Sequence, residues 1–211
     1  MIDLHMHTYY SDGKHSPKYV VEKAHAVGAK MIALTDHDTL DGVPEYLKAA
    51  KKYPDIIAFA GSELSLRDME VLALGIKKPR TLKPEWASYK EAIEAALSMG
   101  AVPVLPHAIR TGLRGRVLDK FIAELKSYGL MGVEVFHPEH KQDMADECLA
   151  LARKHNLLVT AGSDFHEKDE LPYEGFDGSR YVGFFGYTNW KSCPELKKTY
   201  AFFRKWISEP S

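Results

Sequence analysis

MIDLHMHTYYSDG, residues 1–13, opens the chain with an apolar run that ends in two alternating histidines. In an extended strand, successive side chains point to opposite faces, so His5 and His7 point the same way. A Ser-Asp-Gly turn then brings the carboxylate of Asp12 back beside the two imidazoles. The stretch therefore predicts a strand whose end carries either a metal site or a solvated pair of histidines.

Composition limits the size and the class of the protein. The 211 residues, 45% of them hydrophobic, suffice for one sizeable core, and we expect a single domain over residues 1–211. The formal net charge of -1 favours neither a duplex nucleic acid nor a membrane as partner, and nothing in it indicates an oligomeric state. Cys148 and Cys193 match no CxxC pattern, and no signal peptide or span of about 20 apolar residues is present, so we expect a cytoplasmic location.

Short apolar runs alternate with amphipathic segments along the whole chain. Apolar residues at three-to-four spacing predict helices over residues 16–27, 43–52, 90–99, 117–128 and 143–155. The apolar runs predict strands over residues 2–6, 31–35, 56–61, 71–76, 102–105, 132–136 and 157–161. Nearly continuous apolar strands are typical of a parallel sheet that is covered on its outside. The pattern therefore predicts an α/β fold, a small barrel of repeated strand-helix units.

Nearly every predicted strand ends on a residue that can bind a cation. The C-terminal ends of parallel barrel strands meet at one mouth, where such folds place their chemistry. Imidazoles and carboxylates without a thiolate suit zinc, manganese or iron. By contrast, His15, His25 and His155 fall in a turn or a helical pattern, and we interpret them as surface or capping residues. The candidates at strand ends are His5, His7, Asp36, His37, Asp38, Glu63, His107, His137, His140, Asp164 and His166.

Five motifs in order, DLHMHTYYSDG, IALTDHD, GSE, PH and GSDFH, resemble those of the PHP (polymerase and histidinol phosphatase) family of metal-dependent phosphoesterases. The resemblance covers residues 1–167. It implies a distorted (β/α)7 barrel with its active site at the C-terminal ends of the strands, and two or three divalent metal ions, of zinc, manganese or iron. The ligands that it implies are His5, His7, Glu63 and Asp164 for one ion, Asp12, His37 and His166 for another, and Glu63 with His107 for the remaining one, with His137 as a further candidate.

One departure from the family pattern bears on the number of metals. Relatives with three metals carry a histidine in the strand after the glutamate, whereas here that stretch is EVLALGI, with Leu72 at the position of the histidine. Glu70 shares a face with Leu72 only if the strand is regular. Both a binuclear centre and a trinuclear centre with a changed ligand remain open.

Catalytic roles follow from what such a centre does. Divalent cations lower the pKa of a bound water and support its attack on phosphorus. Asp164 is the candidate to accept a proton from that water, and His37 or His140 is the candidate acid for the leaving group. Asp36 and Asp38 flank His37 and are candidates to orient its ring.

A basic loop, AIRTGLRGR, follows His107. Its guanidinium groups, on Arg110, Arg114 and Arg116, are candidates to clamp a phosphate, although a solvated loop would have the same composition. In nucleotide-handling relatives a histidine is followed three residues later by arginine, which favours Arg110.

The predicted reaction is hydrolysis of a small phosphorylated substrate. Motif spacing resembles most the relatives that hydrolyse nucleoside 3',5'-bisphosphates or short 5'-phosphorylated RNA. Histidinol phosphate and cyclic sugar phosphates are other substrates of the family. The alternatives are an amidohydrolase, which would not need the arginine loop, and a degenerate regulatory module that binds a metal or nucleotide.

Aromatic residues between Tyr181 and Trp190 could stack a base or belong to the core.

Overall fold

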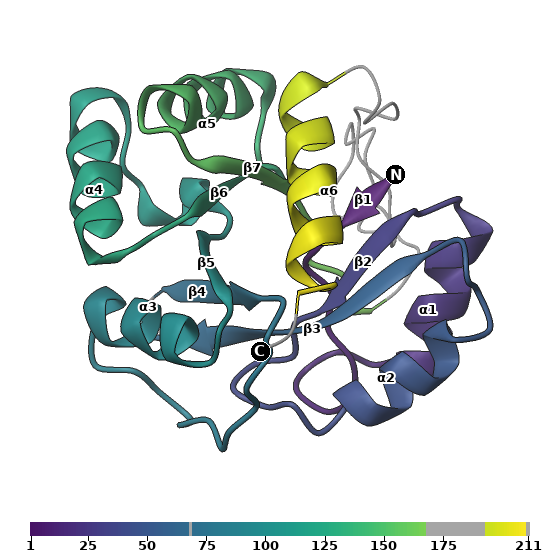
Figure 1. The fold of residues 1–211 in the computed structure, drawn as a ribbon. Coiled ribbons are helices and arrows are strands. Elements are labelled where there is room, and N and C mark those ends of the chain that lie inside the picture. Colours follow the sequence, from purple (N-terminus) through teal and green to yellow (C-terminus); the bar gives the residue numbers. More distant parts are fainter. Residues whose placement is uncertain (68, 168–192, 210–211) are drawn as a thin grey trace.

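The computed structural model describes residues 1–67, 69–167 and 193–209, so the aromatic group between Tyr181 and Trp190 lies outside the described residues. Its strands form one sheet in the order β1 to β7, with helices on the outside (Figure 1). The strands are β1 (Ile2–Asp3), β2 (Met31–Leu34), β3 (Ile57–Ser65), β4 (Glu70–Leu74), β5 (Val102–Leu105), β6 (Gly132–Phe136) and β7 (Leu158–Ala161). The helices are α1 (Pro17–Ala26), α2 (Val43–Ala50), α3 (Tyr89–Ser98), the 3-10 helix η1 (Ala108–Thr111), α4 (Gly115–Tyr128), α5 (Gln142–Lys154) and α6 (Pro194–Trp206).

Backbone hydrogen bonds between the segments that follow β7 and β1 nearly close the sheet into a barrel. The N–H of Leu4 donates to the carbonyl of Ala161 at 2.8 Å, and the N–H of His7 donates to the carbonyl of Phe165 at 2.9 Å. In return, the N–H of Asp164 donates to the carbonyl of His5 at 2.9 Å. The predicted α/β barrel is confirmed, and its closure brings the first and last motifs of the sequence side by side.

The prediction of a parallel sheet is wrong at one strand. β4 runs antiparallel to both β3 and β5, while the other paired neighbours are parallel. Only residues 66–69 join β3 to β4, and a parallel crossover needs a dozen or more. The reversal places Glu70, the first residue of β4, opposite Ser65, at the end of the barrel where the other strands finish.

The sequence analysis also missed helix α6, which packs near the opposite end of the barrel (Figure 1). Phe203 is fully buried, and its ring stacks on Phe59 with 4.9 Å between the ring centroids. Trp206 Nε1 donates to the carbonyl of Gly75 at 3.2 Å. Since Phe59 lies early in β3 and Gly75 follows the end of the reversed β4, the aromatic face of α6 covers the end away from the strand-end residues. Among the described helices, none is long and apolar enough to cross a membrane.

Candidate metal centre

Three groups of imidazoles and carboxylates meet at the mouth of the barrel. In each group, the potential ligand atoms all lie within 4.8 Å of one another. The structure thus brings together the residues that the strand ends supply, and it adds Glu70 from the reversed strand. The groups are His5, His7, Glu63 and Asp164; His7, Asp12, His37 and His166; and Glu63, Glu70 and His107.

Glu63, near the end of β3, belongs to two of these groups. Its Oε2 atom lies 3.0 Å from Nε2 of His5 and 3.2 Å from Nε2 of His7, whereas its Oε1 atom lies 2.9 Å from Nε2 of His107. Burial raises the pKa of Glu63, but His5 and the other imidazoles outweigh burial and hold this pKa well below its usual range. Glu63 is therefore an ionised, buried carboxylate whose two oxygens face different partners.

His7 is fully buried, yet neither of its ring nitrogens makes a hydrogen bond with a described group. Its Nε2 atom lies 3.2 Å from Glu63 Oε2 and 3.4 Å from Asp164 Oδ1. Two ligands of one zinc ion, each about 2.1 Å from it in a tetrahedron, lie about 3.4 Å apart. The donor set and its spacing therefore fit one shared cation.

Protons compete with a cation for the first group. Burial lowers the pKa of His7, but the nearby carboxylates of Asp164 and Glu63 raise it to about 9. Burial also lowers the pKa of His5, and Glu63, Glu134 and Asp164 together raise it well above its usual value. The metal-free mouth thus holds protons where a cation would otherwise balance the carboxylates.

The second group surrounds Asp12, in the turn that follows β1. Asp12 Oδ2 lies 3.3 Å from His166 Nε2 and 3.6 Å from His37 Nε2, and Asp12 Oδ1 lies 3.7 Å from His7 Nδ1. A neutral imidazole has a single lone pair, so His7 can serve only one group. Because its Nε2 atom faces Glu63, we assign His7 to the first group, which leaves Asp12, His37 and His166 in the second.

Glu134, within β6, is a site residue that the sequence analysis missed. Its fully buried carboxylate lies with Oε1 3.2 Å from His5 Nδ1, and its Oε2 accepts the backbone N–H of His107 at 2.8 Å. Burial raises the pKa of Glu134, but His5 and His137 outweigh burial, and the net effect lowers this pKa below its usual value. Glu134 is therefore ionised, and His5 donates to it from Nδ1. In the neutral ring that metal binding requires, the lone pair of His5 Nε2 then faces Glu63. A single glutamate in an otherwise apolar strand was the available signal.

Backbone strain also concentrates at the mouth. Asp38, His107 and Asp164 have positive φ angles of 50°, 23° and 51°, and they are three of the four described non-glycine residues with this conformation. Such backbone persists only where surrounding contacts impose it, and it is common at functional sites. The bond from His107 N–H to Glu134 is one of these contacts.

The two aspartates beside His37 do not hold its ring. Asp36 accepts hydrogen bonds from the N–H and the hydroxyl of Thr8, at 2.6 and 2.7 Å, and so holds the loop after β1. Asp38 accepts the N–H of Ser65 at 3.0 Å. Among the described residues, the hydrogen-bond partner of the His37 ring is Ser65, whose hydroxyl lies 3.4 Å from Nδ1. Asp38 therefore supports His37 only through Ser65, and Asp36 organises the neighbouring loop.

Only one of the three candidate arginines reaches the mouth. Arg110 donates from Nη2 to Asp164 Oδ2 at 2.7 Å, and Glu139 holds the same guanidinium through two bonds of 2.9 and 3.1 Å. Arg114 instead pairs with two acidic residues of α5, at 2.6 and 2.8 Å. Arg116 is exposed on α4. The structure therefore separates Arg110 from the other two members of the predicted clamp.

Two further histidines lie near the groups without joining them. His137 Nδ1 accepts the N–H of Glu139 at 3.1 Å, and its Nε2 atom lies 3.4 Å from Asp164 Oδ2. His140 contacts a carbonyl of β6 through Nδ1 at 2.9 Å and accepts a backbone N–H of η1 through Nε2 at 3.3 Å. Burial lowers the pKa of His140 to about 4, so it is a neutral ring with both nitrogens engaged.

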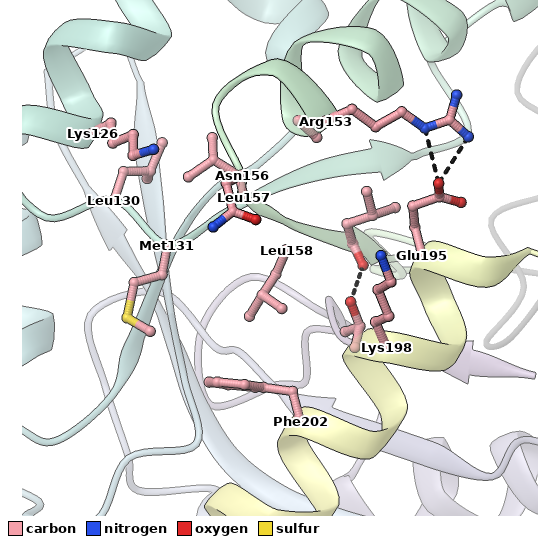
Figure 2. A pocket seen from close by; sticks show the side chains of 13 residues that line it. Lys126, Leu130, Met131, Arg153, Asn156, Leu157, Leu158, Glu195, Lys198 and Phe202 are labelled. Carbon is pink, nitrogen blue, oxygen red and sulfur yellow. Dashed lines mark hydrogen bonds and ion pairs between the residues drawn. The ribbon is translucent and has the colours of Figure 1, made fainter.

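A pocket of about 470 Å³ lies away from the mouth, between α6 and the turns that precede β6 and β7 (Figure 2). Two pairs of its polar groups contact each other: Arg153 pairs with Glu195 at 2.8 Å, and the Thr199 hydroxyl donates to the Val159 carbonyl at 2.7 Å. No histidine is among the described residues that line it. Among the described residues, the groups that could hold a metal ion therefore lie at the mouth and not in this pocket.

Comparisons with known proteins find relatives in sequence and a solved structure of the same fold. A 5'-3' exoribonuclease of Haemophilus influenzae is 23% identical to this chain over 244 residues, covering 78% of this chain and 89% of the relative. A 3',5'-nucleoside bisphosphate phosphatase of Chromobacterium violaceum is 22% identical, covering 86% and 90% of the two chains. The structure of an amidohydrolase from Chromobacterium violaceum, with bound sulfate and no metal, superposes with a TM-score of 0.69 at 21% identity, covering 80% of this chain and 88% of the other.

The sequence also matches a family model, described as the PHP domain, over residues 3–156. This match spans the first four of the five motifs that carry the resemblance, from the paired histidines to His107. The fifth, with Asp164 and His166, lies just beyond it and completes the first two ligand groups. The chain therefore belongs to the PHP domain family.

Proposed function

We propose that this chain is a metal-dependent phosphoesterase acting on a small phosphorylated substrate. The observation that carries the proposal is the convergence of buried imidazoles and ionised carboxylates on Glu63, beside an arginine that is bonded to one of those carboxylates. Metal clusters alone would serve many hydrolases. An arginine held at the same mouth favours an anionic substrate.

Two cations fit the first two groups. His5, His7, Glu63 and Asp164 would hold one, and Asp12, His37 and His166 would hold the other. Their nitrogen and oxygen donors, without a thiolate, suit zinc, manganese or iron. Divalent cations bound there would supply Lewis acidity and lower the pKa of a water molecule for attack on phosphorus.

Arg110 is the residue that we propose to bind the phosphoryl group. Its guanidinium is about one third exposed, and Glu139 fixes its plane by a two-bond contact. Phosphate oxygens can pair with the remaining N–H groups, and such charge-assisted hydrogen bonds are the strong ones. Asp164 then anchors Arg110 from inside the mouth, at 2.7 Å. Arg110 thereby orients the ester relative to the ligand groups.

Proton transfer is constrained by the same contacts. Burial raises the pKa of Asp164, but His5 and His137 outweigh it and hold this pKa well below the usual range, so Asp164 serves better as an ionised ligand than as a general base. His140 has no free nitrogen to donate a proton. His37 cannot donate a proton while its Nε2 atom, which faces Asp12, holds the second cation, so the described residues offer no free side-chain acid for the leaving group.

The substrate class that we propose is a nucleoside 3',5'-bisphosphate or a short 5'-phosphorylated RNA. Support comes from the two relatives named above, one an exoribonuclease and the other a bisphosphate phosphatase, both matched over most of their length. Both names describe hydrolysis of a phosphate ester in a nucleotide. Histidinol phosphate and cyclic sugar phosphates are the alternative esters.

A substrate panel tests the proposal. Metal-loaded protein is incubated with a nucleoside 3',5'-bisphosphate, a 5'-phosphorylated trinucleotide, a cyclic sugar phosphate, histidinol phosphate and a set of amides, and the products are measured. We expect phosphate or nucleotide release from one of the first two and none from the amides. Amide hydrolysis without ester hydrolysis would replace the proposal with an amidohydrolase. Metal binding without any turnover would favour a regulatory module.

A further inference from the structure

Two tyrosines are exposed on the loop between His7 and Asp12, which are candidate ligands of the first and second metal groups. Tyr9 is 52% exposed and Tyr10 is 38% exposed. Among the large apolar side chains that are exposed in the described part of the chain, these two are the only aromatic ones. The chain advances at most about 3.6 Å per residue, so the backbone of each tyrosine lies within about 7 Å of that of a candidate ligand.

Contacts with α2 determine where the two rings lie. The Tyr9 hydroxyl donates to Oε2 of Glu45, in the first turn of α2, at 3.0 Å. The Tyr10 ring packs against Gly42, the N-cap of α2, where a Cβ atom would lie 2.9 Å from Cδ2 of the ring. Because the segment between β2 and Gly42 carries His37, the two rings lie at the rim of the mouth, between the segments that follow β1 and β2.

The two rings adjoin each other and form one aromatic surface, which we call the base platform. Their centroids are 4.9 Å apart, and their planes are inclined by 36°. Exposed aromatic faces are suited to cover a flat apolar ligand, and tyrosine does so at a low cost in conformational entropy. The bond from Tyr9 to Glu45 restricts one ring before a ligand arrives, which lowers that cost further.

We propose that Tyr9 and Tyr10 bind the base of a nucleotide substrate by stacking, and that they give the site its preference for nucleotides over phosphate esters without a base. The proposal rests on the proposed function and deepens it. In a nucleotide the base is one sugar away from the phosphate, so an ester held at the metal groups brings its base to the rim. Every base has a π face, so the platform should discriminate little among the four bases.

The proposed phosphate site and the base platform meet the first ligand group from different elements. Asp164 Oδ2 accepts Arg110, which follows β5, and Asp164 Oδ1 lies 3.4 Å from Nε2 of His7. His7 in turn begins the loop that carries the two tyrosines. This arrangement suits a ligand that has a phosphate at one end and a base at the other.

Binding of analogues that resist hydrolysis tests the platform without relying on turnover. Metal-loaded protein is titrated in a calorimeter with the bis(methylenephosphonate) analogue of adenosine 3',5'-bisphosphate, and with the abasic analogue, in which hydrogen replaces adenine. We expect the wild type to bind the adenosine analogue more tightly. Tyr9→Ala/Tyr10→Ala should lose about 5- to 150-fold in affinity for the adenosine analogue, the range for a base stacked on an aromatic ring, and none for the abasic one. Leu97→Ala, which truncates an exposed apolar side chain of α3, is the control and should match the wild type.

Tyr9→Phe/Tyr10→Phe separates the rings from their hydroxyls. This variant should keep the preference for the adenosine analogue, and circular dichroism checks that each variant is folded. Equal losses for the two analogues in the alanine variant, or a preference for adenosine that survives in it, would overturn the assignment. Ester hydrolysis by a wild type that binds both analogues equally would refute the platform alone. Base-dependent binding without hydrolysis of any ester would leave the platform standing and refute the proposed function.

Photoaffinity labelling tests the unaltered chain. Metal-loaded wild type is irradiated with the 8-azido derivative of the adenosine analogue, digested with trypsin and examined by mass spectrometry. We expect the label on the peptide of residues 1–14, which contains both tyrosines and ends at Lys14, and an excess of the unlabelled analogue should prevent it. Labelling that is prevented in the same way but falls only on other peptides would place the base elsewhere and overturn the assignment.

Discussion

Replacing Glu134 with glutamine changes the charge beside His5 while keeping the shape of the side chain. The amide oxygen can still accept the backbone N–H of His107, which in the wild type donates to Glu134 Oε2 at 2.8 Å. The amide NH₂ group then faces His5 Nδ1, which lies 3.2 Å from the Oε1 position. A neutral His5 ring must respond by moving its proton to Nε2, the atom that faces Glu63 at 3.0 Å. A protonated nitrogen has no lone pair for a cation, so the first group loses one of its four ligands.

Loss of such an orienting carboxylate costs about 10- to 100-fold in metal affinity, or about 1.4 to 2.8 kcal/mol. We expect the upper part of this range, because His5 is fully buried and water cannot easily replace its nitrogen. The assay is competition for Zn²⁺ between the protein and a chromophoric chelator at neutral pH. Circular dichroism melts of the metal-free proteins report whether the substitution also affects folding.

Glu22→Gln, at an exposed site on α1, is the matched control and should bind Zn²⁺ like the wild type. A folded Glu134→Gln protein with wild-type zinc affinity would refute the reasoning, because His5 would then need no carboxylate to fix its tautomer. If the affinity falls together with a large loss of thermal stability, Glu134 acts mainly through the strained backbone of His107, and the tautomer argument fails as well.

Three further predictions use other parts of the structure. Arg110→Ala should raise KM for the phosphate ester at least about tenfold in steady-state kinetics, because charge-assisted hydrogen bonds are lost. Arg114→Ala should leave KM unchanged, because the Arg114 guanidinium pairs with α5. Metal loading at neutral pH should release protons, because His7 has a pKa of about 9 when metal-free and must be neutral to bind a cation. Calorimetry in buffers of different ionisation enthalpy measures this proton release, which should decline as the pH rises past 9. Phe203→Ala should lower the free energy of unfolding by about 3 to 5 kcal/mol in denaturant titration without changing the metal content, since Phe203 is buried away from the mouth.

Much of the mouth could be predicted because its candidate ligands follow strands in the sequence. Alternation within LHMH places His5 and His7 on one face, and parallel strands bring their C-terminal ends together whatever the loops between them do. The convergence of Glu63, His107 and Asp164 therefore followed from topology alone. Local periodicity was also sufficient for the five helices from α1 to α5.

The remaining features depend on tertiary contacts that no local pattern records. Side-chain pairing decided that Arg114 turns to α5 and that Arg110 turns to Asp164, although both lie in one basic loop. Glu134 looked like one polar residue in an apolar strand, and its role depends on His5, 129 residues away. The reversal of β4 was the exception: the short link between Glu63 and Val71 already excluded a parallel crossover, and that signal was overlooked.

The central claim is that cations held at this mouth enable the chain to hydrolyse a phosphate ester. The most direct test measures ester hydrolysis and metal content on the same preparations, loaded with graded amounts of Zn²⁺ and Mn²⁺, for the wild type and for a His7→Ala/Asp164→Ala double variant. The account predicts that the rate rises in proportion to bound metal in the wild type, and that the folded double variant has lost both metal and turnover. Hydrolysis at an undiminished rate in metal-free protein, or in the double variant, would contradict it.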